Sequence, residues 1–254
     1  MLTPEDLYLQ AVVNRHRLPA GDPAAHHIRR QLEPLLQSWA GGHLESVTLS
    51  GSQAKGSALR DGDVDLFLSL APDTPSPLAV LHSSLAARFC DYLPEPRNVS
   101  VRITMGGVKM DGAKVDLVPA RRRPDSGHHT LWQLRHDTWI QTNVAAQIRH
   151  VRDSGLLDEI AALKIWRRRH ALRFPSFYLE LAVLRALSTS PPLSLAASFL
   201  HLLRFLSTDF PASRLLDPAN SNNIVSGLLP PEEKFRIAGA AQMSLRAPSW
   251  PEIL

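Results

Sequence analysis

The chain has 254 residues, 44% of them hydrophobic, and a formal net charge of +4. This composition supports a sizeable core in one large or two modest domains and excludes an intrinsically disordered chain. Cys90 is the only cysteine, so an intramolecular disulfide is excluded. The N-terminus lacks the features of a signal peptide, and no apolar run approaches the ~20 residues of a membrane span. We therefore expect a soluble cytoplasmic protein without a membrane segment.

Hydrophobic periodicity in the first half predicts a mixture of helices and strands. Thr3 can cap a first helix, and Gly41-Gly42 ends a second. The alternation of apolar and polar residues over 64–70 is typical of a strand. Helices are predicted over residues 3–18, 26–39 and 78–91, and strands over 46–49, 64–70, 99–105 and 114–118.

The character of the sequence changes after Pro119. The basic, turn-rich segment 121–127 predicts a solvated linker, which gives domains of residues 1–120 and 121–254. Beyond it, apolar residues recur at helical spacing, so we expect an almost wholly helical second domain that ends in a helix over 231–245. Prolines are predicted to separate its helices: Pro175, Pro191-Pro192 and Pro211.

Three aspartates are the residues that point most directly to chemistry. Asp63 and Asp65 are two positions apart at a strand, so their carboxylates share a face. Asp116 lies within a second alternating segment and joins them if the two strands pair. Converging carboxylates are costly without a cation, and two Mg²⁺ ions would neutralise them and act on a phosphate. For an Asp-x-Asp pair alone, a solvated strand edge is the simpler interpretation.

A glycine-serine turn precedes the aspartates. Gly51 allows a tight turn, and its amide and that of Ser52 begin a short predicted helix, a place that attracts anions. The Ser52 hydroxyl can donate to a phosphate, and Lys55 follows one turn later. An ordinary serine-capped turn between strand and helix is the alternative.

In combination these segments resemble the signature of the nucleotidyltransferase superfamily. The matching residues are Gly51-Ser52, Lys55-Gly56-Ser57, Asp63-Val64-Asp65-Leu66 and Val115-Asp116-Leu117-Val118-Pro119. The resemblance implies an α+β fold, with a polymerase β-like mixed-sheet core, then an all-helical domain, and a nucleotide cleft between the two. It also implies that Asp63, Asp65 and Asp116 hold two Mg²⁺ (or Mn²⁺) ions, while Gly51, Ser52 and Lys55 contact the nucleotide.

The second half resembles the oligoadenylate-synthetase and cGAS-like branch, which includes the bacterial CD-NTases. Its matching segments are Trp139–Asn143, Leu163–Trp166, Pro175–Glu180 and Asp217–Asn223. The resemblance implies that Lys164 and Ser176 reach the triphosphate and that Asn220 lies near the site. Three alternatives remain open. Lys164 can end a helix in solvent, Ser176 can cap a helix, and Asn220 can be a turn residue.

Other conspicuous side chains have simpler interpretations. The pairs His26-His27 and His128-His129 lack the spacing of a zinc site and are predicted to be surface histidines. Trp139 and Trp166 are predicted to be core residues rather than platforms for a base.

We expect an enzyme that transfers a nucleotide from a nucleoside triphosphate and releases pyrophosphate. The product would be a linear or cyclic oligonucleotide second messenger, used in bacterial anti-phage signalling with a downstream effector or a regulator protein. One alternative is a template-independent enzyme that tails RNA, although no RNA-binding module is recognisable. The other is a nucleotide-binding protein without catalysis, which three intact acidic positions argue against.

Overall fold

The computed structural model describes residues 2–19, 21–106, 112–124, 126–188 and 194–254. The chain divides into two compact units, which we call the sheet unit and the helical unit. The sheet unit contains Pro19–Lys55 and Asp61–Ile148. The helical unit contains Met1–Leu18, Gly56–Arg60 and Arg149–Leu254.

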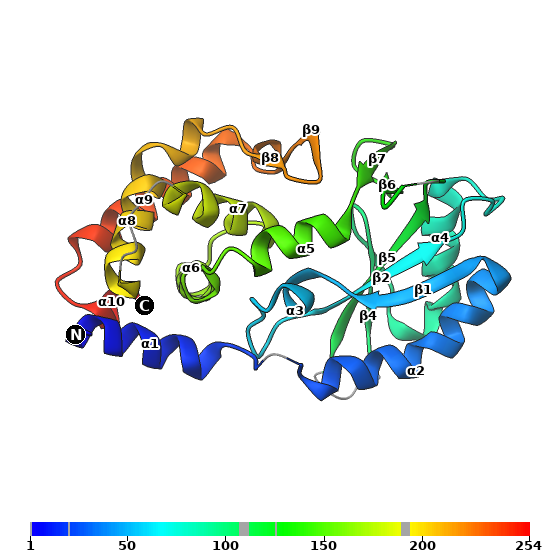
Figure 1. Cartoon of the computed structure of the whole chain (residues 1–254), viewed down its shortest axis with the longest axis horizontal. Helices are drawn as coiled ribbons and strands as arrows, with labels where there is room; N and C mark the ends of the chain where they lie inside the picture. Colours follow the sequence, from blue (N-terminus) through cyan, green and yellow to red (C-terminus); the bar gives the residue numbers. More distant parts are fainter. Residues whose placement is uncertain (1, 20, 107–111, 125, 189–193) are drawn as a thin grey trace. The chain divides into compact units, whose positions relative to one another are not determined.

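A mixed sheet forms the centre of the sheet unit (Figure 1). Its strand order is β1-β2-β5-β4-β3, and β6 joins β5 to β7. The pairing of β2 with β5 is parallel and the other pairings are antiparallel. The strands are β1 (Leu44–Leu49), β2 (Val64–Leu70), β3 (Glu95–Pro96), β4 (Val101–Thr104), β5 (Lys114–Arg122), β6 (His129–Gln133) and β7 (Thr138–Thr142).

Two helices, α2 (Pro23–Ala40) and α4 (Leu78–Arg88), pack against this sheet (Figure 1). Alternation along β2 sends Val64, Leu66 and Leu68 into their shared core. The neighbouring Asp65 therefore points to the opposite face of the sheet. A short helix, α3 (Gly51–Lys55), connects β1 toward β2.

The helical unit is built around one large apolar cluster that includes Trp166, Tyr178, Phe199 and Phe210. Its helices are α1 (Pro4–His16), α6 (Leu157–Arg169), α7 (Ser176–Leu187), α8 (Leu195–Thr208), α9 (Pro231–Arg246) and α10 (Trp250–Ile253), and it carries a hairpin of β8 (Leu216–Asp217) and β9 (Asn220–Ile224). Helix α5 (Val144–Arg152) spans the division between the units at residue 148. Short 3-10 turns complete the described elements: η1 (Gly41–His43), η2 (Cys90–Tyr92), η3 (Phe210–Ala212) and η4 (Val225–Leu228).

The predicted α+β class and the strand over 64–70 are confirmed. Helix α1 lies within the predicted range 3–18, and α9 matches the helix predicted over 231–245, although the short α10 follows it. Thr3 caps α1 and forms a reciprocal capping box with Asp6. Helix α2 begins three residues earlier than predicted, and Gly41 ends it as expected. Helix α4 ends at Arg88, three residues before the predicted limit. The predicted separator Pro191-Pro192 lies outside the described residues.

The region beyond residue 120 departs from the predicted helical domain. β5 continues to Arg122, and β6 and β7 extend the sheet, so the predicted linker is wrong for Arg121 and Arg122. Arg122 is tied to Glu45 by an ion pair of 2.8 Å. The units also differ from the predicted domains, because α1 packs on the helical core and the sheet unit continues to residue 148. These placements depend on tertiary pairing, which local sequence patterns do not report.

Two predictions about aromatic side chains also fail. Trp139 is 54% exposed on the β6–β7 hairpin, although Trp166 is fully buried as predicted. His129 is partly buried rather than a solvated surface histidine: its Nε2 lies 2.9 Å from the Ser69 hydroxyl, and burial lowers its pKa. Among the described residues, no helix is both long enough and apolar enough to cross a membrane.

Candidate active site

The three aspartates come together on one side of the mixed sheet. The parallel pairing of β2 with β5 makes Asp65 and Asp116 direct neighbours in the register, as the sequence predicts. Asp63 lies immediately before β2, two residues from Asp65, and its side chain is 37% exposed. The fold therefore gathers three carboxylates at the beginning of two adjacent strands.

The glycine of the predicted turn is required by this arrangement. Gly51 has a φ of +55°, and a Cβ atom at this position would lie 1.9 Å from Asp65 Oδ2. The Ser50 amide also donates to the Asp65 carbonyl at 2.8 Å, which ties the turn to β2. Ser52 is partly buried in α3, and Lys55 is buried at its end. Only a residue without a side chain allows the turn to approach the carboxylate this closely.

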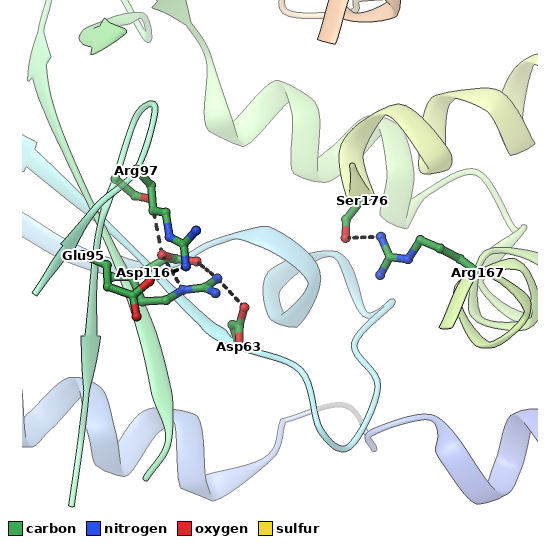
Figure 2. Close-up of polar contacts among 8 residues, drawn as sticks. Asp63, Glu95, Arg97, Asp116, Arg167 and Ser176 are labelled. Atoms are coloured by element: carbon green, nitrogen blue, oxygen red, sulfur yellow. Dashed lines mark hydrogen bonds and ion pairs between the residues drawn. The ribbon is translucent and has the colours of Figure 1, made fainter. Parts of the chain in front are cut away.

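Arg102 is the cation that binds the aspartates. It lies on β4 directly opposite Asp116 in the antiparallel register. Its Nη2 is 2.5 Å from Asp63 Oδ2 and 2.7 Å from Asp116 Oδ2, and its Nε donates to Asp116 Oδ1 at 3.2 Å. Figure 2 shows Asp63 and Asp116 close together, with dashed lines at the hydrogen bonds and ion pairs of both carboxylates. The Ser100 hydroxyl also donates to Asp116 Oδ1, at 3.3 Å.

The electrostatics of the cluster are unbalanced. Burial, with the like charges of Asp116 and Asp63, raises the pKa of Asp65 to about 6, although Lys55 and Arg102 act in the opposite direction. The hydrogen bonds to Asp116 raise the pKa of Arg102, which therefore stays charged. Three carboxylates with this excess of negative charge favour a further cation.

Carboxylate oxygens are the ligands that Mg²⁺ prefers, so the donor set fits this ion. Within the ranges that the structure describes, no three His, Cys, Asp or Glu side chains are arranged as a set of metal ligands. Asp63 and Asp116 are turned to Arg102 instead. Metal binding would therefore require these two side chains to change their partner.

Lys164 is buried in the helical unit rather than exposed at a helix end, so the solvent alternative is wrong. Its Nζ lies 2.7 Å from Glu180 Oε1 and donates to the carbonyl and hydroxyl of Ser57 at 3.1 and 2.9 Å. The side chains of Lys164 and Glu180 are 4% and 1% exposed. These three contacts occupy the three protons of the ammonium. Contact of Lys164 with a triphosphate stays a prediction, and it would require an exchange of partners.

Ser176 is exposed at the first position of α7. The helix has no side-chain cap there, so the capping alternative is wrong. Its hydroxyl accepts a hydrogen bond from Arg167 Nη1 at 3.1 Å (Figure 2). The same Nη1 donates to the Phe174 carbonyl at 2.6 Å, and burial lowers the pKa of Arg167. A hydroxyl and a guanidinium are thus held side by side on the helical unit.

Asn220 begins β9 in a compact hairpin. Its Oδ1 accepts from the Asn222 amide at 3.1 Å, the local pattern of an Asx turn. Asp217 is buried and accepts from the Ala219 amide at 2.8 Å and from Asn223 Nδ2 at 3.3 Å. The turn interpretation of Asn220 fits this hairpin, and its place near a nucleotide stays a prediction.

No family model matches the sequence. A cyclic AMP-AMP-AMP synthase of Escherichia coli (strain MS 115-1) is 28% identical over 262 residues, which cover 85% of this chain and 80% of the synthase. The structure of CdnC from E. coli MS115-1 with ATP matches with a TM-score of 0.73 and 22% identity, covering 96% of this chain and 92% of CdnC. CdnC is also known in a complex with HORMA-deltaN.

Two further structures have the same fold. The Bradyrhizobium diazoefficiens CD-NTase CdnG, in complex with GTP, matches with a TM-score of 0.69 and 14% identity, over 96% of this chain and 92% of CdnG. The Cid1 poly(U) polymerase with Mg 3′-dATP bound matches with a TM-score of 0.64 and 14% identity, over 97% of this chain and 95% of Cid1.

The sequence match, the fold and the three aspartates on neighbouring strands agree. The chain is a nucleotidyltransferase that resembles the CD-NTases in sequence and in fold. The predicted resemblance is therefore confirmed, as is the predicted type of enzyme.

Two polar residues of this nucleotidyltransferase were not predicted from the sequence. Arg102 alternates with the buried Val101 and Ile103, so the sequence pattern could predict that it lies on the polar face of the strand. The pattern could not predict its partners. Arg167 follows Lys164 by three residues on α6, within a run of arginines that composition assigns to solvent. Strand register and helix packing give both residues their partners.

Proposed function

We propose that the protein joins nucleotides, from nucleoside triphosphates and a divalent metal, into a cyclic oligonucleotide that acts as a second messenger. The observation that carries this proposal is the convergence of Asp63, Asp65 and Asp116 beside a turn that only glycine can form. The likeness to the E. coli cyclic AMP-AMP-AMP synthase supports a cyclic product and makes ATP the first substrate to test.

The carboxylates of Asp63, Asp65 and Asp116 would hold Mg²⁺ or Mn²⁺, two ions in all. Bound ions of this kind lower the pKa of an attacking hydroxyl and neutralise charge on the leaving pyrophosphate. The chemistry of the donor set supports this assignment, because all three side chains offer oxygen ligands and their mutual repulsion favours a cation.

The reaction joins two nucleotides by one displacement. The oxygen of a ribose hydroxyl forms a bond to the α-phosphorus, the bond from that phosphorus to the pyrophosphate oxygen breaks, and the hydroxyl proton passes to water. We assign the phosphates to Gly51, Ser52 and Lys55 on the sheet unit. Within the helical unit, Ser176 and its neighbour Arg167 also present groups of the kind that bind phosphate oxygens.

Repetition of this step, ending with attack by the free end of the same chain, closes a ring. We place this product in bacterial anti-phage signalling, where it would activate an effector protein. The complex of CdnC with HORMA-deltaN supports a regulator protein as a partner of this chain too.

The test is product identity. Purified protein is incubated with each NTP and each NTP pair, with Mg²⁺ or Mn²⁺, and the products are resolved by mass spectrometry. A cyclic oligonucleotide and pyrophosphate are expected without RNA. The likeness in fold to the Cid1 poly(U) polymerase motivates an arm with added RNA. Product that requires RNA would replace the proposal by RNA tailing.

The control variant is Asp116→Asn, which keeps the shape of the side chain and removes its charge. Loss of product with retained folding is expected for a catalytic carboxylate. Nucleotide binding without product in both proteins, with or without RNA and candidate regulators, would indicate a catalytically silent protein.

A further inference from the structure

Four charged residues form one row across the sheet. Asp65 on β2 is the register neighbour of Asp116 on β5, Asp116 that of Arg102 on β4, and Arg102 that of Glu95 on β3. Register neighbours point to the same face, with Cβ atoms about 4.5–5.5 Å apart. The guanidinium therefore has a carboxylate on each side, although it donates its hydrogen bonds to Asp116 and Asp63.

A metal ion and Arg102 would compete for the same oxygen atoms. The guanidinium binds Asp63 Oδ2 and both carboxylate oxygens of Asp116, and its side chain is only 20% exposed. An oxygen that accepts a short hydrogen bond from a guanidinium uses a lone pair that a metal needs. Both cations satisfy the negative charge of the cluster, so occupation by one lowers affinity for the other.

We propose that Arg102 is a positioning residue that holds Asp63 and Asp116 in the metal-free enzyme and releases them when the divalent metal binds. This inference rests on the proposed function. The released guanidinium pairs with Glu95, its neighbour on β3. Free metal ions thereby bind weakly, and the nucleotide-bound metal, which brings its own phosphate contacts, displaces Arg102 more readily.

Glu95 is suited to accept the guanidinium. Its side chain is 56% exposed, and its Oε2 lies 2.5 Å from Arg97 Nη2 (Figure 2). An exposed pair of this kind contributes little stability, so Glu95 can exchange or share its partner at small cost.

Binding of free Mn²⁺, without nucleotide, tests the exchange by titration followed by electron paramagnetic resonance. We expect Arg102→Gln to bind Mn²⁺ about tenfold more tightly than the wild type. Arg102→Lys, which keeps the charge but loses the fork, should fall between the two. Arg123→Gln is the matched control, because its guanidinium contacts Gln141 and none of the aspartates. Its Mn²⁺ affinity should equal that of the wild type.

Two further readouts separate release from simple repulsion between charges. Glu95→Gln should weaken Mn²⁺ binding in the wild type and have less effect in Arg102→Gln, because the two residues act as a pair. In nuclear magnetic resonance spectra, the guanidinium signal of Arg102, assigned by its absence in Arg102→Gln, should change from hindered to free rotation when Mg²⁺ is added.

The exchange would be overturned if the wild type and Arg102→Gln bound Mn²⁺ with equal affinity and the guanidinium signal stayed hindered. Product formation by the wild type would then leave the proposed function intact. No Mn²⁺ binding by either protein, combined with no product from any NTP, would overturn both. A thermal melt of each metal-free variant confirms folding, and Arg102→Lys keeps the test valid if Arg102→Gln does not fold.

Discussion

The two units of the molecule treat charge in opposite ways. In the helical unit, Lys164 and Glu180 form an ion pair that is almost wholly buried, and the Ser57 hydroxyl and carbonyl complete the shell of the ammonium. In the sheet unit, Asp63 and Asp116 share Arg102 and remain partly exposed, and Asp65 lies beside Asp116 in the register. The first cluster is neutral and the ammonium in it has hydrogen-bond partners, whereas the second cluster keeps an excess of negative charge.

We expect this difference to separate a structural cluster from a reactive one. A buried pair whose hydrogen bonds are complete has nothing left to offer a ligand, and removal of one partner leaves an unpaired charge. A cluster in which burial and two neighbouring carboxylates raise the pKa of Asp65 to about 6 is stabilised by a ligand of positive charge. Charge balance, more than residue type, therefore indicates which cluster performs chemistry. The following variants can break or sharpen this contrast.

The largest effect is expected for Asp65→Asn. We predict that turnover falls by about 10³-fold or more, since a charge-stabilising group at the reacting phosphate is removed. The melting temperature of the metal-free protein should stay the same or rise, because the ionised carboxylate is disfavoured in the fold. Steady-state kinetics and thermal melts measure both quantities. Asp73→Asn, at an exposed residue, is the control. A large loss of stability would show that Asp65 is structural.

Lys164→Met should have the opposite effect, with a large loss of stability as its main consequence. Removal of one partner from the buried pair is expected to lower the free energy of unfolding by about 3–5 kcal/mol. The double variant Lys164→Met with Glu180→Leu should recover much of this loss, because no unpaired charge remains. Urea denaturation gives the values, with the exposed Lys114→Met as a control. Unchanged stability with a large rise in KM would instead make Lys164 a phosphate ligand.

Gly51→Ala tests the close contact between turn and carboxylate. The positive φ alone costs an alanine about 1–2 kcal/mol, and its Cβ would lie 1.9 Å from Asp65 Oδ2. We therefore expect a stability loss above that range and strongly reduced nucleotide binding. In a protein that already carries Asp65→Gly, the stability loss caused by Gly51→Ala should fall toward the cost of the positive φ alone. If the stability losses of Gly51→Ala and Asp65→Gly were simply additive in the double variant, the close approach of Gly51 to the Asp65 carboxylate would be contradicted.

Arg167→Ala is expected to raise the KM for the nucleoside triphosphate about tenfold with a smaller change in kcat, since it removes one charge-assisted hydrogen bond. Arg169→Ala, whose guanidinium contacts the Pro251 carbonyl, is the neighbouring control on α6. Equal kinetics for the two variants would exclude Arg167 from the phosphate site.

The smallest effect concerns pH. The Ala196 and Thr3 amides donate to Asp6 and, with the Ser194 hydroxyl, lower its pKa from 3.8 to about 2. Because the pKa in the folded state is below that of the unfolded chain, the stabilisation is complete above about pH 4 and is lost as the pH falls through 2. Melting temperatures of wild type and Asp6→Asn should differ at neutral pH and converge in acid. A constant difference would contradict this assignment.

Local patterns were sufficient for much of the reactive cluster. Alternation defined β2 and β5, and the spacing of two residues placed Asp63 and Asp65 together. Gly51 marked the turn, and apolar periodicity marked most helices of the second half. These features depend on neighbours within a few residues, so the sequence by itself determined the fold class and marked the three carboxylates. The enzyme class came from the resemblance of these segments to the nucleotidyltransferase signature.

Tertiary structure decided which charges meet. Strand register put Arg102 beside Asp116, and the packing of α6 against α7 buried Lys164 with Glu180. Long-range pairing also carried the sheet beyond residue 120 and joined α1 to the helical unit. The partner of each cation lies on a segment far away in the chain, and local periodicity does not report which distant segments pack together. The sequence therefore specified the acids, and only the fold specified the bases that hold them.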